Sequence, residues 1–333
     1  MTVILHLLLL LLSAAIIWAL SGLLIGATDR VAKRYNRPGF AIAFFVLGVL
    51  TSISEISVAT NATLEGVPQV SAGNLVGGSI VIFLLIIPLL AVLGGGLPMT
   101  SALTRGNLAF LLGVVVLPSL LILDGSVSRV EGVLMVFLYV TLLYTVQKRK
   151  PAGDIVEETM QHVEEELLHT KGMFFTRHAT LVDVAKIAFA GVLIFLGGKL
   201  LVHESIYFST LLSIPPSLVG LILLSIGTNA PELVIAVRCI VGKHKDIAFG
   251  DYMGSAAANT PLMGFLALAN GKFALERSEF VPTFFLLLIG LIAFFVFSRS
   301  KNDISRKEGI MLLCLYGGFL VMQFINIARF AGE

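Results

Sequence analysis

From Leu224 to Asn259 the chain reads LSIGTNAPELVIAVRCIVGKHKDIAFGDYMGSAAAN, and a diverged form of this stretch occurs once more. The earlier copy runs from Leu50 to Ile82 and reads LTSISEISVATNATLEGVPQVSAGNLVGGSIVI. A single offset of 177 residues carries Glu55 onto Glu232 and aligns the polar and glycine positions around both. One offset that holds across both halves predicts an internal duplication of the chain.

Each copy places a glutamate inside strongly apolar sequence. A carboxylate at membrane depth costs about 2.5 kcal/mol or more, so such groups are usually kept for binding or transport. The duplication therefore predicts two functional carboxylates on equivalent helices. The same offset of 177 also pairs Thr51 with Thr228, Gly73 with Gly250, Asn74 with Asp251 and Gly77 with Gly254.

The composition is that of a protein embedded in a bilayer. Of the 333 residues, 57% are hydrophobic and only 13% are charged, whereas a soluble domain carries about 25% charged residues. The mean hydropathy is +0.96. These values predict a polytopic membrane protein with the lipid bilayer as its surroundings and no nucleic-acid partner.

Apolar runs suited to transmembrane helices, which need about 20 residues, recur along the whole chain. We count about ten of them, five in each half. They divide the chain into a first membrane repeat (1–147), an acidic cytoplasmic linker (148–180) and a second membrane repeat (181–333). The expected spans are 3–26, 40–62, 71–93, 107–123, 129–147, 181–203, 213–240, 247–269, 279–298 and 308–328.

Lysine and arginine residues predict the orientation, because cytoplasmic connections are enriched in them. With the N-terminus outside, 17 of the 23 basic residues fall on cytoplasmic connections and five fall outside. We therefore expect both termini outside and the linker in the cytoplasm. The expected location is the cell (inner) membrane.

Five spans in each half is an odd number, so the second repeat must enter the membrane with the opposite orientation. Inverted repeats bring equivalent motifs together near the bilayer midplane, as in many secondary transporters. The expected fold class is an all-α polytopic membrane protein with about ten transmembrane helices arranged as two inverted five-helix repeats. Glu55 and Glu232 would then approach each other from antiparallel helices.

The residues around the glutamates predict a site for a hard cation. Thr51 and Glu55 are spaced i, i+4, as are Thr228 and Glu232, so each pair shares a helix face. Pro231 removes a backbone donor and frees a carbonyl one turn earlier. Hydroxyl, carbonyl and carboxylate oxygens are the ligands that Ca²⁺ prefers. The ions are transported substrates in this interpretation, and no cofactor is expected.

The segment after each glutamate carries a second set of positions. Asp251, Ser255 and Asn259 form a polar stripe at i, i+4 and i+8, whereas the matching first-half stripe is Asn74, Gly78 and Ile82. The first half therefore loses polar ligands where the second half keeps them. The glycine pairs Gly73–Gly77 and Gly250–Gly254 predict close helix packing.

These residues resemble the cation/calcium exchanger superfamily, which includes sodium/calcium and calcium/proton exchangers. Its two repeats read approximately G-T-S-x-P-E and then G-N-x-x-G-S-x-x-x-N/D. The second repeat here matches through Gly227 to Glu232 and Gly250 to Ser255 with Asn259, and the first matches less closely through Leu50 to Glu55 and Gly73 to Gly77.

The resemblance implies alternating-access antiport with Glu55 and Glu232 as shared Ca²⁺ ligands. It maps five further residues onto ligand positions for Ca²⁺ or Na⁺, namely Thr51, Ser52, Thr228, Ser255 and Asn259. Asn229 stands where the family has serine and Asp251 where it has asparagine, and both are kept as candidate ligands.

Three other departures concern the first repeat, where Ser54 replaces proline and Gly78 and Ile82 replace the serine and asparagine ligands. They imply fewer sodium ions, protons as the counter-ion, or a changed substrate.

Several functions remain open at this point. The leading hypothesis is a secondary-active antiporter, not an enzyme, that exchanges Ca²⁺ for H⁺ or Na⁺. The alternatives are a passive cation channel or uniporter on the same scaffold and a degenerate homologue that transports nothing. An intramembrane aspartyl protease, which Gly250-Asp251 could suggest, needs two facing aspartates, and no second aspartate lies clearly within a segment. The oligomeric state stays open.

Overall fold

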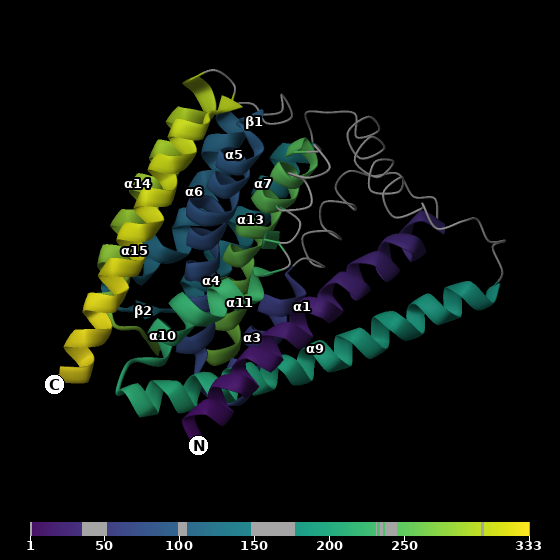
Figure 1. The fold of residues 1–333 in the computed structure, drawn as a ribbon, viewed down its shortest axis with the longest axis horizontal. Coiled ribbons are helices and arrows are strands. Elements are labelled where there is room, and N and C mark those ends of the chain that lie inside the picture. Colours follow the sequence, from purple (N-terminus) through teal and green to yellow (C-terminus); the bar gives the residue numbers. More distant parts are fainter. Residues whose placement is uncertain are drawn as a thin grey trace.

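Nearly all of the described chain is helical (Figure 1). The computed structural model describes residues 2–34, 52–98, 105–147, 177–230, 232–233, 236, 245–300 and 303–332. Within these residues, six helical stretches are long and apolar enough to cross a membrane. The protein is therefore an all-α integral membrane protein, as the composition predicts.

The described residues of the first repeat form five helical segments, in the expected order. The third is one continuous rod in which a π-helical turn separates two α-helices, and its Ile87 N–H bonds the Ile82 carbonyl five residues earlier. The segments are α1 (Thr2–Arg34), α3 (Ile53–Leu64), the rod of α4 (Pro68–Ile80), η1 (Val81–Ile86) and α5 (Ile87–Gly94), α6 (Arg105–Leu121) with the 3-10 turn η2 (Ile122–Asp124), and α7 (Arg129–Gln147).

The described residues of the second repeat form five counterparts. Its first helix begins at Arg177, inside the stretch 148–180 expected to be linker, and the remaining acidic part of that stretch lies outside the described residues. The segments are α9 (Arg177–Leu212), the rod of α10 (Pro216–Val219), η3 (Gly220–Leu224) and α11 (Ser225–Thr228), α13 (Lys245–Asn270), α14 (Arg277–Ser300) and α15 (Arg306–Gly332).

The long helices α1 and α9 lie side by side, along the edge of a bundle formed by the other helices (Figure 1). His6 near the start of α1 bonds Glu204 near the end of α9 at 2.7 Å, while Ile17 packs against Gly197. From His6 to Ile17 the residue numbers rise on α1, while those of their partners on α9 fall from Glu204 to Gly197. The two helices are therefore antiparallel. Because the offset of 177 carries α1 onto α9, the equivalent helices of the two repeats are inverted with respect to each other.

Two short antiparallel ladders connect the repeats at opposite ends of the bundle (Figure 1). The strand β1 (Leu97–Pro98) pairs with β4 (Asp303–Ile304), and β2 (Ser126–Val127) pairs with β3 (Phe273–Ala274). In the second repeat, the strand equivalent to β1 is β3 and the strand equivalent to β2 is β4. The symmetry between the repeats therefore places the β1–β4 ladder on the β2–β3 ladder. Such an exchange is what a pseudo-two-fold axis between inverted repeats produces.

The final helix of each repeat begins with the same capping box. In α7 the Ser128 N–H donates to Glu131 Oε2 at 2.7 Å, and in α15 the Ser305 N–H donates to Glu308 Oε2 at 2.8 Å. Each pair satisfies backbone donors that the first helical turn leaves without partners. The offset of 177 is therefore visible in local structure as well as in sequence.

Helix α4 crosses α10 and η3 at very close range. A Cβ atom added at Gly73 would clash with the Ser217 carbonyl oxygen, and one added at Gly220 would clash with the Val70 carbonyl oxygen. Gly77 lies equally close to the backbone of η3. The predicted packing role of Gly73 and Gly77 is confirmed, and the contact holds the centre of one repeat against the centre of the other.

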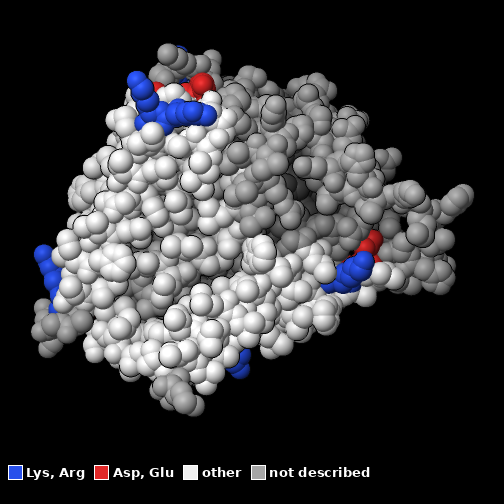
Figure 2. Space-filling view, in the orientation of Figure 1, with Lys and Arg blue, Asp and Glu red and all other residues white. Residues whose placement is uncertain are grey.

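The described part of the surface carries few charged side chains on the face in view. There, Figure 2 shows the lysine, arginine and acidic side chains of the described residues toward the margins, with a broad uncharged area between them. Large apolar side chains on the outer helices are exposed, for example Leu8 at 57%, Phe137 at 63% and Phe324 at 62%. An apolar surface between charged edges is suited to the hydrocarbon core of a bilayer.

Candidate ion-binding site

Glu55 is buried in the first turn of α3, with 1% of its surface exposed. The Ser54 hydroxyl lies 2.8 Å from Glu55 Oε2 and 3.3 Å from the Thr228 carbonyl oxygen, so Ser54 connects α3 with the end of α11. A first-half glutamate therefore meets the second-half stretch that carries its counterpart.

Thr228 and Asn229 lie where the helix of the second repeat is interrupted. The α-helix α11 ends at Thr228, and Asn229 has non-helical dihedral angles. The Thr228 hydroxyl donates to Asn74 Oδ1 on α4 at 3.1 Å, and Asn229 Nδ2 donates to the Ser225 carbonyl at 2.8 Å. Pro231, which predicts an interruption, lies outside the described residues.

Glu232 is also 99% buried, with 1% of its surface exposed. The Ser255 hydroxyl on α13 lies 3.5 Å from Glu232 Oε1, and the Tyr252 hydroxyl donates to the Glu232 carbonyl at 3.1 Å. One turn after Ser255, Asn259 Nδ2 donates to the Ser79 hydroxyl on α4 at 3.3 Å. The polar stripe of α13 therefore faces both Glu232 and the equivalent helix of the first repeat.

Two buried oxygen atoms at equivalent positions lack hydrogen-bond partners. They are Ser52 Oγ, just before α3, and Asn229 Oδ1, and neither atom has a partner within the described part of the chain. The offset of 177 relates the two residues. An unpaired buried polar oxygen costs free energy, and a cation that accepts it as a ligand would remove this cost.

Gly78 faces the same region. A Cβ atom added there would lie 3.0 Å from Asn229 Nδ2 and 3.2 Å from Asn259 Nδ2. The space beside Gly78 is therefore occupied by amide nitrogens from the second repeat. An amide nitrogen donates hydrogen bonds and does not serve as a ligand for a hard cation.

The arrangement combines two buried carboxylates with neutral oxygen groups. Within the described residues no cluster of three or more His, Cys, Asp or Glu side chains is found. Two carboxylates match the charge of one divalent cation, and oxygen ligands favour Ca²⁺ or Na⁺ over softer transition metals.

Seven of the nine predicted ligands lie together in the described part of the structure. The structure brings Ser52, Glu55, Thr228, Asn229, Glu232, Ser255 and Asn259 into the buried junction of α3, α4, α11 and α13. Thr51 lies outside the described residues, and the Asp251 side chain is not described although its backbone belongs to α13.

Sequence reasoning missed three contributors. Ser54 was noted only as a replacement for proline, Asn74 only as the counterpart of Asp251, and Ser79 was not noted at all. For Ser54 the available signal was a polar residue at the position where the other repeat has Pro231. Asn61 lies in the last turn of α3, where it is buried and its Nδ2 donates to the Phe195 carbonyl of α9.

Comparisons with known proteins agree with this architecture. The family model for sodium/calcium exchanger protein matches residues 5–147 and 183–325, one segment in each repeat. The sodium/calcium exchanger MaX1 of Methanosarcina acetivorans is 34% identical over 143 residues, 43% of this chain and 41% of that protein. The inner membrane protein YrbG of Escherichia coli is 25% identical over 90% of this chain and 89% of its own length.

Solved structures resemble the fold over nearly the whole chain. The H⁺/Ca²⁺ exchanger CAX superimposes with a TM-score of 0.74 at 17% identity, over 98% of this chain and 85% of that one. The sodium-calcium exchanger NCX_Mj superimposes with a TM-score of 0.62 at 21% identity, over 96% of this chain and 99% of that one. At these identities the likeness establishes the fold, with its ten helices in two inverted repeats.

Proposed function

Because the chain belongs to the sodium/calcium exchanger protein family, we propose that it is a secondary-active cation antiporter that exchanges Ca²⁺ for H⁺ or Na⁺. The family consists of transporters and not of enzymes. The family description and the name of the relative MaX1 both specify exchange of sodium and calcium. The transported ions are substrates. This proposal takes the ion classes from the related proteins and the binding residues from the geometry of this chain.

One observation carries the proposal. Glu55 and Glu232 are each 1% exposed, occupy equivalent positions of inverted repeats, and both have partners at the junction of α3, α4, α11 and α13. A buried pair of carboxylates is costly unless something compensates their charge. A divalent cation bound between them would do so, with Ser52, Thr228, Asn229, Ser255 and Asn259 as neutral ligands and Thr51 and Asp251 completing the proposed set.

Coupling follows from competition at the same oxygen atoms. Protons and Ca²⁺ cannot occupy a carboxylate oxygen together, so a carboxylate that releases Ca²⁺ on one side can accept protons there and carry them back. Sodium would compete in the same way through neutral oxygen ligands. Amide nitrogens occupy the space beside Gly78. The site therefore offers fewer oxygen ligands for sodium than a full set of hydroxyl and amide oxygens would provide. The proton is therefore the preferred counter-ion of this proposal.

Exchange requires that the site open to each side in turn. In inverted-repeat transporters the two repeats rock around a fixed central site. We place the protein in the cell (inner) membrane with both termini outside, on the basis of the basic residues in its connections. The name of the inner membrane protein YrbG agrees with this location.

The decisive experiment is Ca²⁺ efflux from proteoliposomes that contain the purified protein. An inward proton gradient (acidic outside) without sodium should drive Ca²⁺ efflux. An inward sodium gradient at uniform pH should drive less Ca²⁺ efflux. Robust sodium-driven efflux with none driven by pH would identify Na⁺ as the counter-ion and reject the proton preference.

The same vesicles separate the alternative functions. A channel or uniporter would release Ca²⁺ with no opposing ion gradient, at a rate that follows the membrane potential alone. A degenerate homologue would release none under any gradient, and either result would reject the antiporter proposal.

A further inference from the structure

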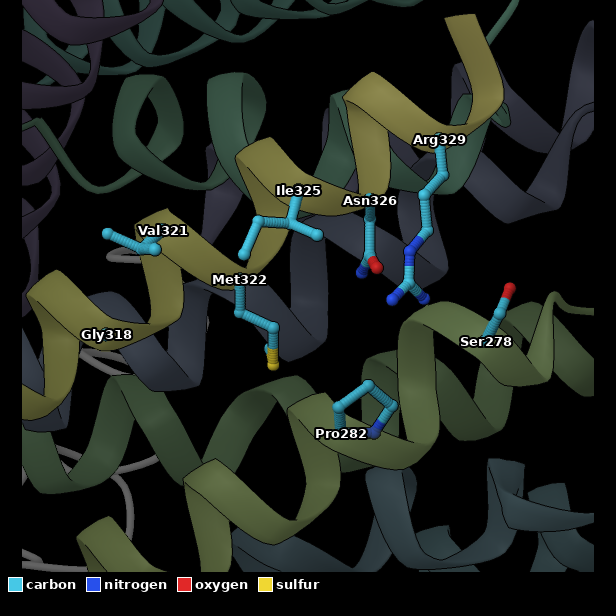
Figure 3. A pocket seen from close by; sticks show the side chains of 8 residues that line it. All are labelled: Ser278, Pro282, Gly318, Val321, Met322, Ile325, Asn326 and Arg329. Atoms are coloured by element: carbon cyan, nitrogen blue, oxygen red, sulfur yellow. The ribbon is translucent and has the colours of Figure 1, made fainter. Parts of the chain in front are cut away.

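A groove runs between α14 and α15, which contribute no residue to the candidate ion-binding site (Figure 3). Its volume is about 390 Å³. Along most of its length it is apolar, lined by Gly318, Val321, Met322 and Ile325 of α15 and by Pro282 of α14. Val321 is 60% exposed and Ile325 is 50% exposed, so this lining faces the surroundings of the protein and not its core.

The other end of the groove is polar and carries a positive charge. Arg329 and Asn326 extend from α15 toward α14, which contributes Ser278 (Figure 3). No acidic side chain of the described residues forms an ion pair with Arg329. Pro282 has no N–H with which to bond the Ser278 carbonyl. The polar end thus offers a free cation, donor groups and an acceptor.

The length of the groove corresponds to one leaflet of a bilayer. Gly318 and Arg329 are eleven residues apart on α15, which is about 16 Å at a rise of 1.5 Å per residue. Half of the hydrocarbon core is about 15 Å thick. Arg329 lies in the last turn of the helix, where the polar headgroups are expected, and Gly318 lies toward the middle of the membrane.

The groove is open at its apolar end and supported beneath its polar end. A Cβ atom added at Gly318 would meet no atom within 4 Å, so the missing side chain leaves room on the surface. Below the groove, Gln323 Nε2 of α15 donates to Thr283 Oγ1 of α14 at 2.9 Å, and Asn326 Nδ2 donates to Gln323 Oε1 at 3.2 Å. These bonds fix the separation of the two helices and the orientation of Asn326.

We propose that this groove binds one anionic phospholipid. The phosphate is bound by the Arg329 guanidinium, with Ser278 and Asn326 completing the polar contacts, and an acyl chain lies along Gly318, Val321 and Ile325. A guanidinium matches the geometry of a phosphate and forms charge-assisted hydrogen bonds with it. An acyl chain needs an exposed apolar channel of this length, whereas a soluble phosphate compound would leave that channel empty.

The test is native mass spectrometry of the full-length protein titrated with phosphatidylglycerol or with phosphatidylcholine of the same acyl chains. The unmodified protein should retain one phosphatidylglycerol in preference to phosphatidylcholine. R329Q should weaken phosphatidylglycerol binding about tenfold, as the loss of a charge-assisted bond would. G318L should weaken it as well, by filling the acyl channel while the charge remains.

The matched control is K307Q, which removes an exposed positive charge from the opposite end of the same helix. K307Q should bind phosphatidylglycerol like the unmodified protein, and size-exclusion chromatography should give the same profile for all variants. Equal binding of the two lipids, or unchanged phosphatidylglycerol binding by both R329Q and G318L, would overturn the proposal. A dimer that G318L dissociates would also overturn it, because a second copy would then occupy the groove.

Discussion

Helix α4 and its counterpart α13 occupy equivalent places in the two repeats, yet they bring different groups to the candidate site. In α13, Ser255 and Asn259 point polar groups at Glu232 and at Ser79. In the first repeat, the matching positions are Gly78 of α4 and Ile82 of η1, and the Nδ2 atoms of Asn229 and Asn259 occupy the space beside Gly78. Side chains of the second repeat fill the space that Gly78 of the first repeat leaves, so the site is asymmetric.

The strongest test of the comparison is to remove the buried carboxylate that both repeats bring to the candidate site. E55Q and E232Q should each reduce Ca²⁺ transport at least about 100-fold, because a buried carboxylate supplies charge that no solvent can replace. Calcium uptake into proteoliposomes measures the effect. E65Q, at the exposed end of α3, is the matched control and should transport normally. Normal rates in E232Q would refute the assigned role.

A smaller effect is expected where the repeats differ. G78A adds a methyl group 3.0 Å from Asn229 Nδ2 and 3.2 Å from Asn259 Nδ2, and overpacking of this kind costs about 1–3 kcal/mol. We expect transport to fall about tenfold. G113A is the control, since its added Cβ atom would meet nothing within 4 Å. Equal rates for G78A and G113A would mean that the two amides do not contribute to the site.

The two unpaired oxygens allow a direct comparison of equivalent ligands. S52A and N229A each remove one neutral oxygen that lacks a partner among the described residues. Each variant should raise the Ca²⁺ concentration for half-maximal transport about fivefold, since a neutral hydrogen bond or ligand is worth about 1 kcal/mol. Transport at saturating Ca²⁺ should persist. If the Ca²⁺ concentration for half-maximal transport rose in only one of the two variants, the ions would bind mainly to the repeat that carries that residue.

The smallest effect should be the same in both repeats. S128A and S305A remove equivalent capping boxes, whose serine hydroxyls each lie 2.7 Å from the partner glutamate. Each should lower the free energy of unfolding by about 1 kcal/mol, as measured by thermal unfolding in detergent. S128T and S305T keep the hydroxyl and should stay close to the unmodified protein. A large difference between the two alanine variants would contradict the equivalence of these helix starts.

The repeat architecture could be read from the sequence because it depends on spacing and hydrophobicity. The offset of 177, the glutamates and the run of apolar segments were enough, and α7 begins and ends at the expected residues 129 and 147. The extent of α1 and α9 could not be read, since both continue beyond their apolar runs. Local hydropathy does not report contacts between two long helices that stabilise each other.

The candidate site was only partly predictable. Glutamates in apolar sequence are conspicuous because they are costly, so Glu55 and Glu232 could be recognised from the sequence alone. Ser54 and Asn74 are neutral and common, and their importance depends on partners 174 and 154 residues away in the chain. The amides beside Gly78 were equally hidden, because a glycine in a sequence does not reveal which side chains occupy its empty space.

The π-helical turn η1 records how the two copies of the duplicated chain diverged. Before it, equivalent residues are 177 apart, as for Gly77 and Gly254. At the ends of the equivalent rods they are 176 apart, where Gly95 and Gly271 have φ angles of 77° and 76°, and the offset is 177 again at Ser128 and Ser305. A single residue gained by the first copy, or lost by the second, would be accommodated by this wider turn. Evolution could thus change the length of one rod while leaving both of its ends, and the ladder beyond it, in place.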